Sequence, residues 1–384
     1  MKKHWMFLLL VLFFSAGILA ACGDNRKDPP DAGEIETLSV NWADAADSSS
    51  RTLIFRFWNN SENYFNTDNA GDKSFQYWPN AHALDVITDA CLRSGDSFYK
   101  DYFDRWFEGV RRKNGNTWYN VFYDDMEWIA LAMLRAYNAT DDGKWLAACR
   151  EVWQDIKTGW NERGGGGIAW KKDQLWSKNA CSNGPPAILA ARLYRQFGDE
   201  EDKEWAEKIY AWLRETLFMP GVGSVADNLN TETGVINSSW IFTYNQGTFL
   251  GAALELYEIT GEKIYINDAV KAADYTINAL VNANDALLKS EGTGDGGLFK
   301  GIFVRYFAQL ILSDGITEAT RKKYLTFLKH NGETLWKQGT DKQWVLFAPY
   351  WKDKPGTTTG LTEQLSGCML MEALAMLDRE GLLK

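Results

Sequence analysis

Two consecutive aspartates, Asp124 and Asp125, lie in a segment of the chain that is rich in aromatic residues, 118–128. Aspartates often cap the start of a helix, so the pair alone is weak evidence for catalysis. Here the neighbouring aromatic side chains would exclude water and raise the pKa of one carboxyl group, and two close carboxylates resist ionising together. One group could then stay protonated near neutral pH while the other stays charged. Glycoside hydrolysis needs such a pair, with one nucleophile and one acid/base.

The spacing of the pair bears on the stereochemical course. Retaining glycosidases hold their carboxyl groups ~5–5.5 Å apart, whereas inverting enzymes need ~6.5–9.5 Å to admit a water. Neighbouring residues start ~3.8 Å apart at their Cα atoms. Two adjacent side chains that both point into a cleft reach the shorter separation more easily, which favours retention.

Charge and histidine content argue against several other functions. Residues 1–21 hold two lysines and no acid, so the remainder carries 39 basic and 51 acidic residues, a net charge of −12. Such a chain is not expected to bind nucleic acid, whose phosphates need a basic surface. Apart from His4, only His82 and His330 are present, which excludes a three-histidine zinc site. Because P-loop and EF-hand patterns are also missing, we expect no metal.

Apolar residues recur with the 3.6-residue period of amphipathic helices along most of the chain, and no segment has the sustained alternation of a strand. The sequence therefore predicts an all-α protein. We expect twelve helices, at 39–58, 80–93, 97–112, 125–138, 142–157, 185–197, 200–218, 245–259, 262–281, 300–312, 317–336 and 362–380.

The connections between these helices alternate in length. Tight turns with glycine beside an acid occur at 94–96, 140–143, 197–199 and 260–262, and long loops at 59–79, 113–124, 158–184, 219–244, 282–299 and 337–361. Alternate loops of up-and-down helices lie at opposite ends, so all the long loops fall on one face. Six such hairpins fit a closed (α/α)6 toroid with a site on that face. An open helical-repeat solenoid used for binding is the alternative.

The first residues have the layout of an export signal. Basic Lys2 and Lys3 precede an apolar run, and the sequence Leu-Ala-Ala-Cys at 19–22 matches the bacterial lipobox. We therefore expect a signal peptide at 1–21, lipidation of Cys22, a flexible tether at 22–38 and one folded domain at 39–384. The remaining cysteines lie far apart in the sequence, so we expect buried free thiols at Cys91, Cys149, Cys181 and Cys368.

Polar and aromatic residues near the ends of the long loops are candidates for contacts with a ligand. Amides there can hydrogen-bond sugar hydroxyl groups or cap helices, and aromatic rings can stack on sugar faces. The glycine run at 164–167 could bring backbone close to a ligand or form a flexible loop. Besides the aspartate pair, the candidates are Asn80, His82, Tyr123, Trp128, Asn179, Asn183, Tyr244, Asn245, Gln246, Lys300 and Arg305.

These motifs together resemble glycoside hydrolase family 76, which contains bacterial endo-α-1,6-mannanases and related fungal cell-wall proteins. The resemblance covers residues 39–381 and rests on Tyr-Asp-Asp-Met-Glu-Trp at 123–128, Gly-Gly-Gly-Ile-Ala-Trp at 165–170, Lys-Asn-Ala-Cys-Ser-Asn-Gly-Pro at 178–185, Tyr-Asn-Gln-Gly-Thr-Phe at 244–249 and Lys-Gly-Ile-Phe-Val-Arg at 300–305. It implies an (α/α)6 fold and hydrolysis of α-1,6-mannan with retention and no obligatory cofactor. By the same resemblance, Asp124 is the nucleophile, Asp125 the acid/base and Asp227 a sugar-binding acid.

A lipobox on this domain resembles the mannan-degrading lipoproteins of Bacteroidetes, which implies a protein anchored by lipid to the outer membrane and facing the periplasm or the cell surface. Because nothing in the sequence suggests an obligate interface, we expect a monomer. Three other functions stay open. A transglycosylase would share these residues but pass the mannosyl unit to a sugar acceptor. A non-catalytic mannan-binding lipoprotein would use the same aromatic cleft without turnover. Another (α/α)6 enzyme, an inverting glycosidase or a lyase, would need a more distant carboxylate such as Glu127 or Asp227.

Overall fold

The computed structural model describes residues 39–383. The expected signal peptide, the lipidated Cys22 and the tether at 22–38 lie outside these residues. From Val40 onward the chain forms one unit made almost entirely of helices, and none of the helices in the described range has the length and apolarity that a membrane crossing requires.

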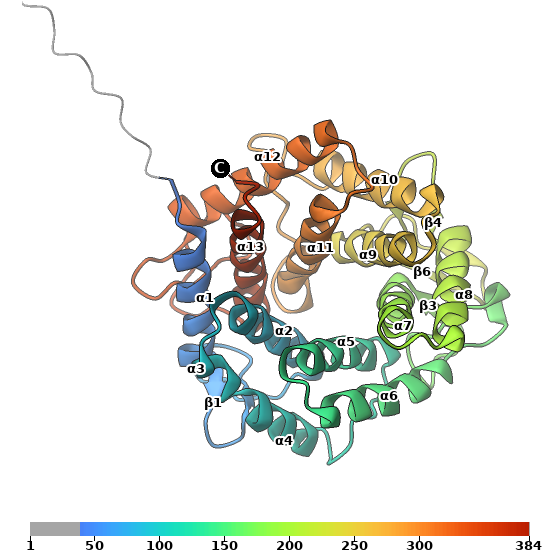
Figure 1. Cartoon of the computed structure of the whole chain (residues 1–384), viewed down its shortest axis with the longest axis horizontal. Coiled ribbons are helices and arrows are strands. Elements are labelled where there is room, and N and C mark those ends of the chain that lie inside the picture. Colours follow the sequence, from blue (N-terminus) through green and yellow to red (C-terminus); the bar gives the residue numbers. More distant parts are fainter. Residues whose placement is uncertain (1–38, 384) are drawn as a thin grey trace, which may run out of the picture. The chain divides into compact units, whose positions relative to one another are not determined.

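Six helices form the inner ring of this unit (Figure 1). They are α2 (Tyr77–Ser94), α5 (Tyr123–Thr140), α7 (Gly184–Phe197), α9 (Thr243–Thr260), α11 (Asp295–Leu312) and α13 (Leu361–Arg379). Each packs against the next inner helix along the chain, and α13 returns to pack against α2, which closes the ring. The closed ring confirms the predicted (α/α)6 toroid and excludes an open solenoid, whose terminal repeats would not meet.

An outer layer of helices covers the inner ring. It consists of α1 (Trp42–Phe57), α3 (Ser97–Lys100), α4 (Phe103–Lys113), α6 (Gly143–Lys157), α8 (Glu200–Thr216), α10 (Lys263–Ala279) and α12 (Glu318–Thr334). α1 packs against α13, while α6, α8 and α10 pack against α5, α7 and α9. The outer helices bury one face, as at Trp145, Cys149 and Trp153 of α6, whereas nearly every residue in the first three-quarters of α9 is buried.

Small residues let the inner helices approach one another closely. A Cβ atom added to Gly247 of α9 would lie 2.6 Å from the Cα atom of Phe303 in α11. A Cβ atom added to Gly301 of α11 would lie 2.7 Å from the Cα atom of Ser366 in α13. Both distances are shorter than real Cβ contacts, so glycine at these positions sets the spacing of the ring.

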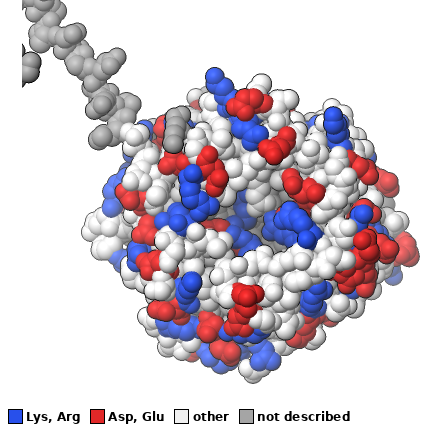
Figure 2. All heavy atoms as spheres, viewed as in Figure 1, with Lys and Arg blue, Asp and Glu red and all other residues white. Residues whose placement is uncertain are grey.

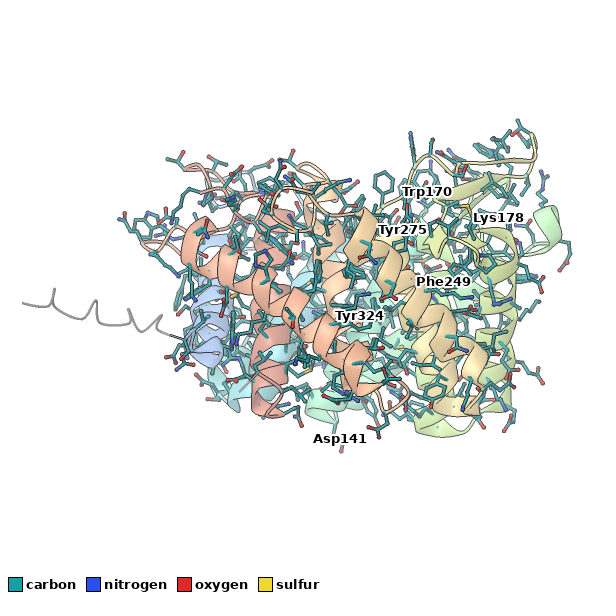
Figure 3. The ribbon with its side chains drawn as sticks, turned by 90° about the horizontal axis from the view of Figure 1, so that it is seen from above. Asp141, Trp170, Lys178, Phe249, Tyr275 and Tyr324 are labelled. Atoms are coloured by element: carbon teal, nitrogen blue, oxygen red, sulfur yellow. The ribbon has the colours of Figure 1, made fainter. Side chains whose placement is uncertain are left out.

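The tight turns and the long loops lie at opposite ends of the ring, as predicted. Gly95, Gly198 and Gly261 end α2, α7 and α9 with φ values of 67°, 74° and 71°, a left-handed conformation that favours glycine. Figure 3 shows Asp141, which ends α5, at this turn end and Trp170 at the opposite, loop end. The N-termini of the inner helices therefore all point to the loop end.

Arginines gather around the centre of the turn end. Figure 2 shows lysine and arginine side chains around a central hollow there, and Arg135 and Arg192 line a cavity of about 620 Å³. These arginines are paired with carboxylates: Arg192 Nε lies 2.5 Å from Glu255 Oε1, and Arg135 Nη1 lies 2.6 Å from Asp85 Oδ1. Because the carbonyl ends of the inner helices also meet here, the arginines offset their partial negative charge.

Short strands fasten the long loops to one another. β3 (Ser177–Asn179), β6 (Asn228–Asn230) and β7 (Val235–Ile236) form an antiparallel sheet with Lys178 opposite Leu229. Two further antiparallel pairs are β1 (Trp58–Asn59) with β2 (Tyr64–Phe65) and β4 (Phe218–Met219) with β5 (Ser224–Val225). Segments of two or three residues are too short to show an alternating pattern, so the sequence does not predict them.

Two predicted helices differ from the observed ones by more than a shift of three residues at an end. The predicted helix 97–112 is broken after Lys100, and α11 begins at Asp295 rather than at residue 300. The glycines of the 292–297 run suggested a loop, but Gly297 is helical, and a Cβ atom added to it would lie 2.9 Å from the Thr362 hydroxyl oxygen at the start of α13. The early start of α11 brings Asp295 to the loop end.

Candidate active site

A cavity of about 320 Å³ opens at the centre of the loop end, where the N-termini of α2, α5, α9 and α11 meet the loop before α7. Five predicted site residues line it, namely Asp124, Asp125, Trp128, Asn179 and Tyr244. Its other lining residues are Trp78, Phe122, Trp170, Cys181, Asp295 and Phe299. The cavity therefore combines carboxyl groups with aromatic walls.

Asp124 lies in the first turn of α5, where two side chains donate hydrogen bonds to its carboxylate. Trp170 Nε1 lies 3.1 Å and Cys181 Sγ 3.3 Å from the same oxygen, Oδ2. Burial raises the pKa of the Asp124 carboxyl group above its usual range, and the hydrogen bonds from Cys181 and Trp170 oppose that rise because they stabilise the charged form.

Asp125 lines the same cavity, but no side chain among the described residues donates a hydrogen bond to its carboxyl group. Burial raises the pKa of Asp125 well above its usual range, and the negative charges of Asp124 and Asp295 raise it further. These surroundings favour the protonated form of Asp125, whereas the hydrogen bonds from Trp170 and Cys181 favour the charged form of Asp124.

Two pairs of aromatic rings line the cavity. Phe122 and Trp170 pack with ring centroids 5.0 Å apart, and Tyr244 and Phe299 stack at 4.0 Å and 15°. Flat apolar faces beside polar groups suit a sugar ring, which presents C–H groups on its faces and hydroxyl groups at its edge.

Asp295 is the third carboxylate of the cavity, and it does not belong to the motifs that predict the site. Its Oδ1 atom accepts a hydrogen bond of 3.1 Å from Nε1 of Trp78, which joins the N-terminus of α11 to that of α2. The only signal in the sequence was its place in a glycine-rich segment, which matched no known ligand-binding pattern. Phe299 follows one helical turn later and was missed for the same reason.

Three of the predicted amide ligands, Asn80, Asn183 and Gln246, are buried and act as clamps between loops instead of lining the cavity. Asn80 bonds the backbone of Phe65, and Asn183 bonds both backbone atoms of Ile168. Gln246 bonds the backbone nitrogen and oxygen of Val225 at 2.9 Å each. These amides therefore bond the backbone of the loops, and none of the three lines this cavity.

Four further candidates also lie away from the cavity. His82 is buried within the ring beside Trp128, and burial lowers its pKa to about 3. Arg305 pairs with Asp89 near the turn end at 2.8 Å. Lys300 donates to the backbone oxygen of Pro349 behind the wall, and Tyr123 contacts a threonine hydroxyl group in the loop that follows α6.

Asp227 and Asn245 form a pair just outside the lining. Asn245 Nδ2 donates to Asp227 Oδ1 at 2.9 Å, and both residues are buried. Burial raises the pKa of the Asp227 carboxyl group, while the hydrogen bond from Asn245 opposes the rise. The negative charge of Asp227 raises the pKa of Cys181 and of Tyr244, both of which line the cavity. The pair therefore affects the electrostatics of the cavity without lining it.

The glycine run at 164–167 packs against protein and not against the cavity. A Cβ atom on Gly167 would lie 2.7 Å from the indole ring of Trp212, and one on Gly166 would lie 2.5 Å from Trp160. The Nζ atom of Lys178 donates to the backbone oxygen of Gly167. These contacts fix the loop that carries Trp170 toward Asp124.

The free cysteines match the prediction, since Cys91, Cys149, Cys181 and Cys368 are all buried and unpaired. Among residues 39–383 no cluster of three or more His, Cys, Asp or Glu side chains has the geometry to hold a metal ion.

The chain matches glycosyl hydrolase family 76 over residues 41–384. Because the match spans nearly the whole folded domain, the protein belongs to this family. The resemblance that its motifs indicate is therefore confirmed.

Solved structures and curated relatives agree with this assignment. An inactive double-aspartate variant of an α-1,6-mannanase from Salegentibacter sp., in complex with α-1,6-mannotetrose, is 44% identical, with a TM-score of 0.85 over 88% of this chain and 100% of that one. A family 76 mannosidase from Bacteroides thetaiotaomicron shares the fold at 23% identity, with a TM-score of 0.76 over 89% of this chain and 100% of that one. A mannan endo-1,6-alpha-mannosidase of Candida glabrata is 26% identical over 67% of this chain, which spans 61% of that relative's length.

Proposed function

We propose that the protein is a retaining, endo-acting glycoside hydrolase that cleaves α-1,6-mannosidic bonds within mannan backbones. The observation that carries the proposal is the pair of consecutive carboxyl groups in one aromatic cavity, of which only Asp124 receives hydrogen bonds from side chains. The pair supplies one charged and one protonated group, as a double-displacement mechanism requires.

The solved mannanase supports the choice of this pair. Its inactive form carries substitutions at two consecutive aspartates and binds α-1,6-mannotetrose. This chain has two such pairs, at 124–125 and at 141–142. Asp141 and Asp142 lie at the turn end between α5 and α6, away from any aromatic cavity, whereas Asp124 and Asp125 line one.

In the proposed mechanism Asp124 attacks the anomeric carbon of a mannosyl unit while Asp125 gives its proton to the departing glycosidic oxygen. The bond between the anomeric carbon and that oxygen breaks, and a covalent mannosyl–Asp124 ester forms. Asp125, now a carboxylate, removes a proton from a water that attacks the anomeric carbon and releases Asp124. The aromatic walls hold the sugar rings in position for both steps.

The environment of the other carboxylates favours this pair over an inverting arrangement. Glu127 is fully buried, lies outside the cavity lining, and has a pKa raised well above its usual range by burial. Asp227 is held by Asn245 behind the wall. Neither side chain is placed to activate a water against a sugar bound between Phe122 and Tyr244.

The decisive test is incubation of the folded domain with linear α-1,6-mannan, with Asp124→Asn alongside. We expect a ladder of oligosaccharides from the wild type and a rate lower by a factor on the order of 10⁴ or more for the variant, because the amide cannot act as the nucleophile. Retention is checked by the anomeric form of the first product in NMR. A near-normal rate for Asp124→Asn would overturn the assignment.

The same assay separates the proposal from its alternatives. Transfer products that appear only when a sugar acceptor is added, without release of reducing ends in its absence, would indicate a transglycosylase. Binding of mannan by wild type and variant without products from either would indicate a binding protein.

We also propose that the protein is exported and anchored to the outer membrane through a lipid on Cys22. The lipobox at 19–22 and the polar segment that follows it support this location. Wild type should partition into the detergent phase of a membrane extract, and Cys22→Ser should not. Equal partitioning of the two proteins would reject the anchor.

A further inference from the structure

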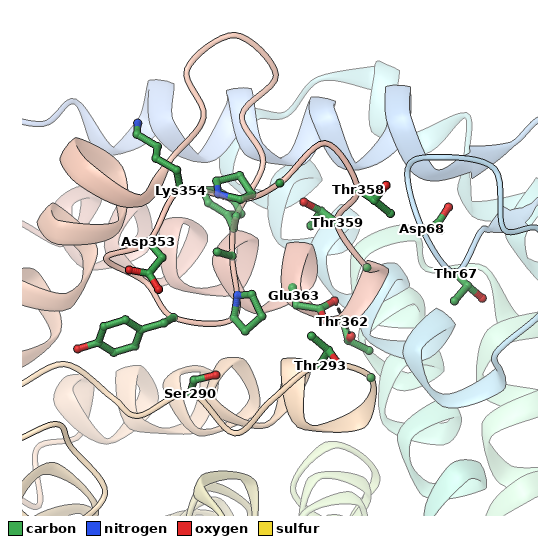
Figure 4. Close-up of a pocket in the computed structure, with 18 of the residues that line it drawn as sticks. Thr67, Asp68, Ser290, Thr293, Asp353, Lys354, Thr358, Thr359, Thr362 and Glu363 are labelled. Atoms are coloured by element: carbon green, nitrogen blue, oxygen red, sulfur yellow. Dashed lines mark hydrogen bonds between the residues drawn. The ribbon is translucent and has the colours of Figure 1, made fainter.

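A second cavity, of about 780 Å³, lies at the loop end over the N-terminus of α13 (Figure 4). Three segments far apart in the sequence form it: the loop before α2, the loop before α11, and the long loop before α13 together with the first turn of that helix. None of its lining residues takes part in the mechanism described above.

The second cavity adjoins the aspartate cavity at two points. Gly294 lines the second cavity while Asp295, the next residue, lines the first. Gln76 lines the second while Trp78, two residues later, lines the first. The hydrogen bond from Trp78 Nε1 to Asp295 Oδ1, at 3.1 Å, therefore stands on the border between the two cavities.

The chemistry of the lining suits a neutral compound with many hydroxyl groups. Three carboxylates but only one lysine line the cavity, and that lysine, Lys354, donates to the backbone oxygen of Thr340. Such a lining repels anions and accepts hydrogen bonds from hydroxyl groups. The hydroxyl groups that line it belong to Thr67, Ser290, Thr293, Thr358, Thr359 and Thr362, and Tyr350 adds an aromatic ring.

One of these hydroxyl groups lacks a partner. Thr359 is only 5% exposed, and its Oγ1 atom makes no hydrogen bond with any described residue. A buried hydroxyl group without a hydrogen-bond partner lowers the stability of the folded protein. A ligand or a water is therefore expected to bind to it. Close by, Glu363 accepts a hydrogen bond from Thr362 through Oε2 only, at 3.0 Å.

Backbone contacts hold this wall of the cavity in place. Thr359 N donates to Asn69 Oδ1 at 2.7 Å, Asn69 N donates to the backbone oxygen of Thr359 at 3.2 Å, and Leu361 N donates to the backbone oxygen of Thr67 at 2.8 Å. The loop before α13 is thus tied to the loop before α2 without use of the Thr359 hydroxyl group. The cavity is built before any ligand arrives, which lowers the entropy lost on binding.

We propose that the second cavity binds neutral mannosyl units of the substrate that extend from the aspartate cavity past the Trp78–Asp295 contact. The proposal rests on the proposed function, since it assigns the further units of the same saccharide. Two parts of the mannan can supply these units: the continuing α-1,6-linked backbone or a side branch. Both present neutral mannosyl units to the cavity.

The test compares wild type with Thr359→Val, which keeps the shape of the side chain and the backbone hydrogen bonds but removes the hydroxyl group. The kcat/KM value is measured for linear α-1,6-manno-oligosaccharides of increasing length. We expect the variant to match wild type on the shortest oligosaccharide that is cleaved and to lose roughly three- to tenfold on the longer ones, the effect of one hydrogen bond to a buried hydroxyl group. Thr326→Val, on the outer helix α12, is the matched control and should change nothing.

A second variant and a second substrate complete the test. Ser290→Ala lies in the loop on the opposite side of the cavity, so it repeats the measurement if Thr359→Val is poorly folded by circular dichroism. If a side branch is the source, the variants lose activity on branched mannan and keep it on every linear oligosaccharide. Wild-type rates for both variants on all lengths and on branched mannan would overturn the inference while leaving the proposed function intact. No cleavage of any substrate by wild type would overturn the proposed function, and this inference with it.

Discussion

Asp124 and Asp125 are identical side chains one residue apart, and only their surroundings make them different. Trp170 and Cys181 donate to Asp124, whereas Asp125 faces the negative charges of Asp124 and Asp295. Hydrogen bonds to the charged form lower a pKa and neighbouring charges of the same sign raise it. The division of roles in the proposed mechanism therefore depends on residues from the loop before α7 and from α11.

The thiol of Cys181 gives a direct test of that dependence. In Cys181→Ala the Asp124 carboxylate loses a donor, so its pKa should rise and the acid limb of the pH profile of kcat/KM should move to higher pH. A hydrogen bond worth ~1 kcal/mol to the charged form corresponds to a shift of roughly 0.7 pH unit. In Cys181→Ser the hydroxyl group keeps a donor, so the limb should stay in place or move to lower pH.

Cys149→Ala is the control for the thiol substitution, because Cys149 is also buried but lies in the outer helix α6. Its acid limb should match that of wild type. If Cys181→Ala also matched wild type, the thiol would have no part in keeping Asp124 charged.

Single residues also show where sequence reasoning reaches its limit. The structure brings the aspartate pair, Trp128, Asn179 and Tyr244 together, because each lies at or shortly after the end of a long loop and all long loops lie at one end of the ring. The amides of Asn80, Asn183 and Gln246 have the same positions in sequence, yet they bond loop backbones. Spacing cannot separate an amide that clamps a loop from one that faces a cavity, since the difference arises only from the packing of distant segments.

At the scale of the elements, the close approach of α9 and α11 depends on Gly247. In Gly247→Ala the new methyl group would meet the backbone of Phe303, which cannot move independently of α11. We expect the free energy of unfolding to fall by ~1–3 kcal/mol, as for other overpacked cores. Because α9 carries Tyr244 into the active-site wall, activity on mannan should fall as well. Chemical denaturation and the mannan assay measure the two effects.

Gly143→Ala is the matched control for this helix contact. Gly143 is the first residue of α6, and a Cβ atom there would meet no other atom within 4 Å. Its free energy of unfolding should change by less than ~1 kcal/mol, and an increase is expected because alanine favours helix. An unchanged free energy of unfolding in Gly247→Ala would show that α9 and α11 can move apart without a loss of stability.

The helices themselves were largely predictable, because their apolar period and their glycine-ended turns are local signals. The exceptions depend on tertiary contacts. α11 begins early because Gly297 packs under α13, and the paired strands β3 and β6 form because two long loops meet over the site. Neither contact leaves a pattern within one segment. For this reason the sequence did not indicate Asp295 and Phe299, which the early start of α11 brings to the site.

At the scale of the whole molecule, the closure of the ring by α13 against α2 makes the six hairpins interdependent. In an open solenoid each repeat contacts only its neighbours, so terminal repeats can unfold alone. In the closed ring the last hairpin has neighbours on both sides, and the second cavity and the aspartate cavity each combine residues from inner helices or loops that are distant in sequence. Both cavities should therefore disappear together when the ring opens.

Leu374→Ala in α13 tests this interdependence. Leu374 is fully buried and contacts Gly332 of α12, so its truncation should lower the free energy of unfolding by ~2–5 kcal/mol. The control is Leu92→Ala, at a half-exposed position of α2, which should lower the free energy of unfolding by about 0.5 kcal/mol or less. If the ring unfolds as one unit, hydrogen exchange in α5, which is separated from α13 by α2 in the ring, should accelerate as much as in α13, and near- and far-ultraviolet circular dichroism should report one coincident transition. Loss of protection in α13 alone, with α5 unchanged, would mean that the hairpins behave as independent repeats and that closure adds little to the stability of the active site.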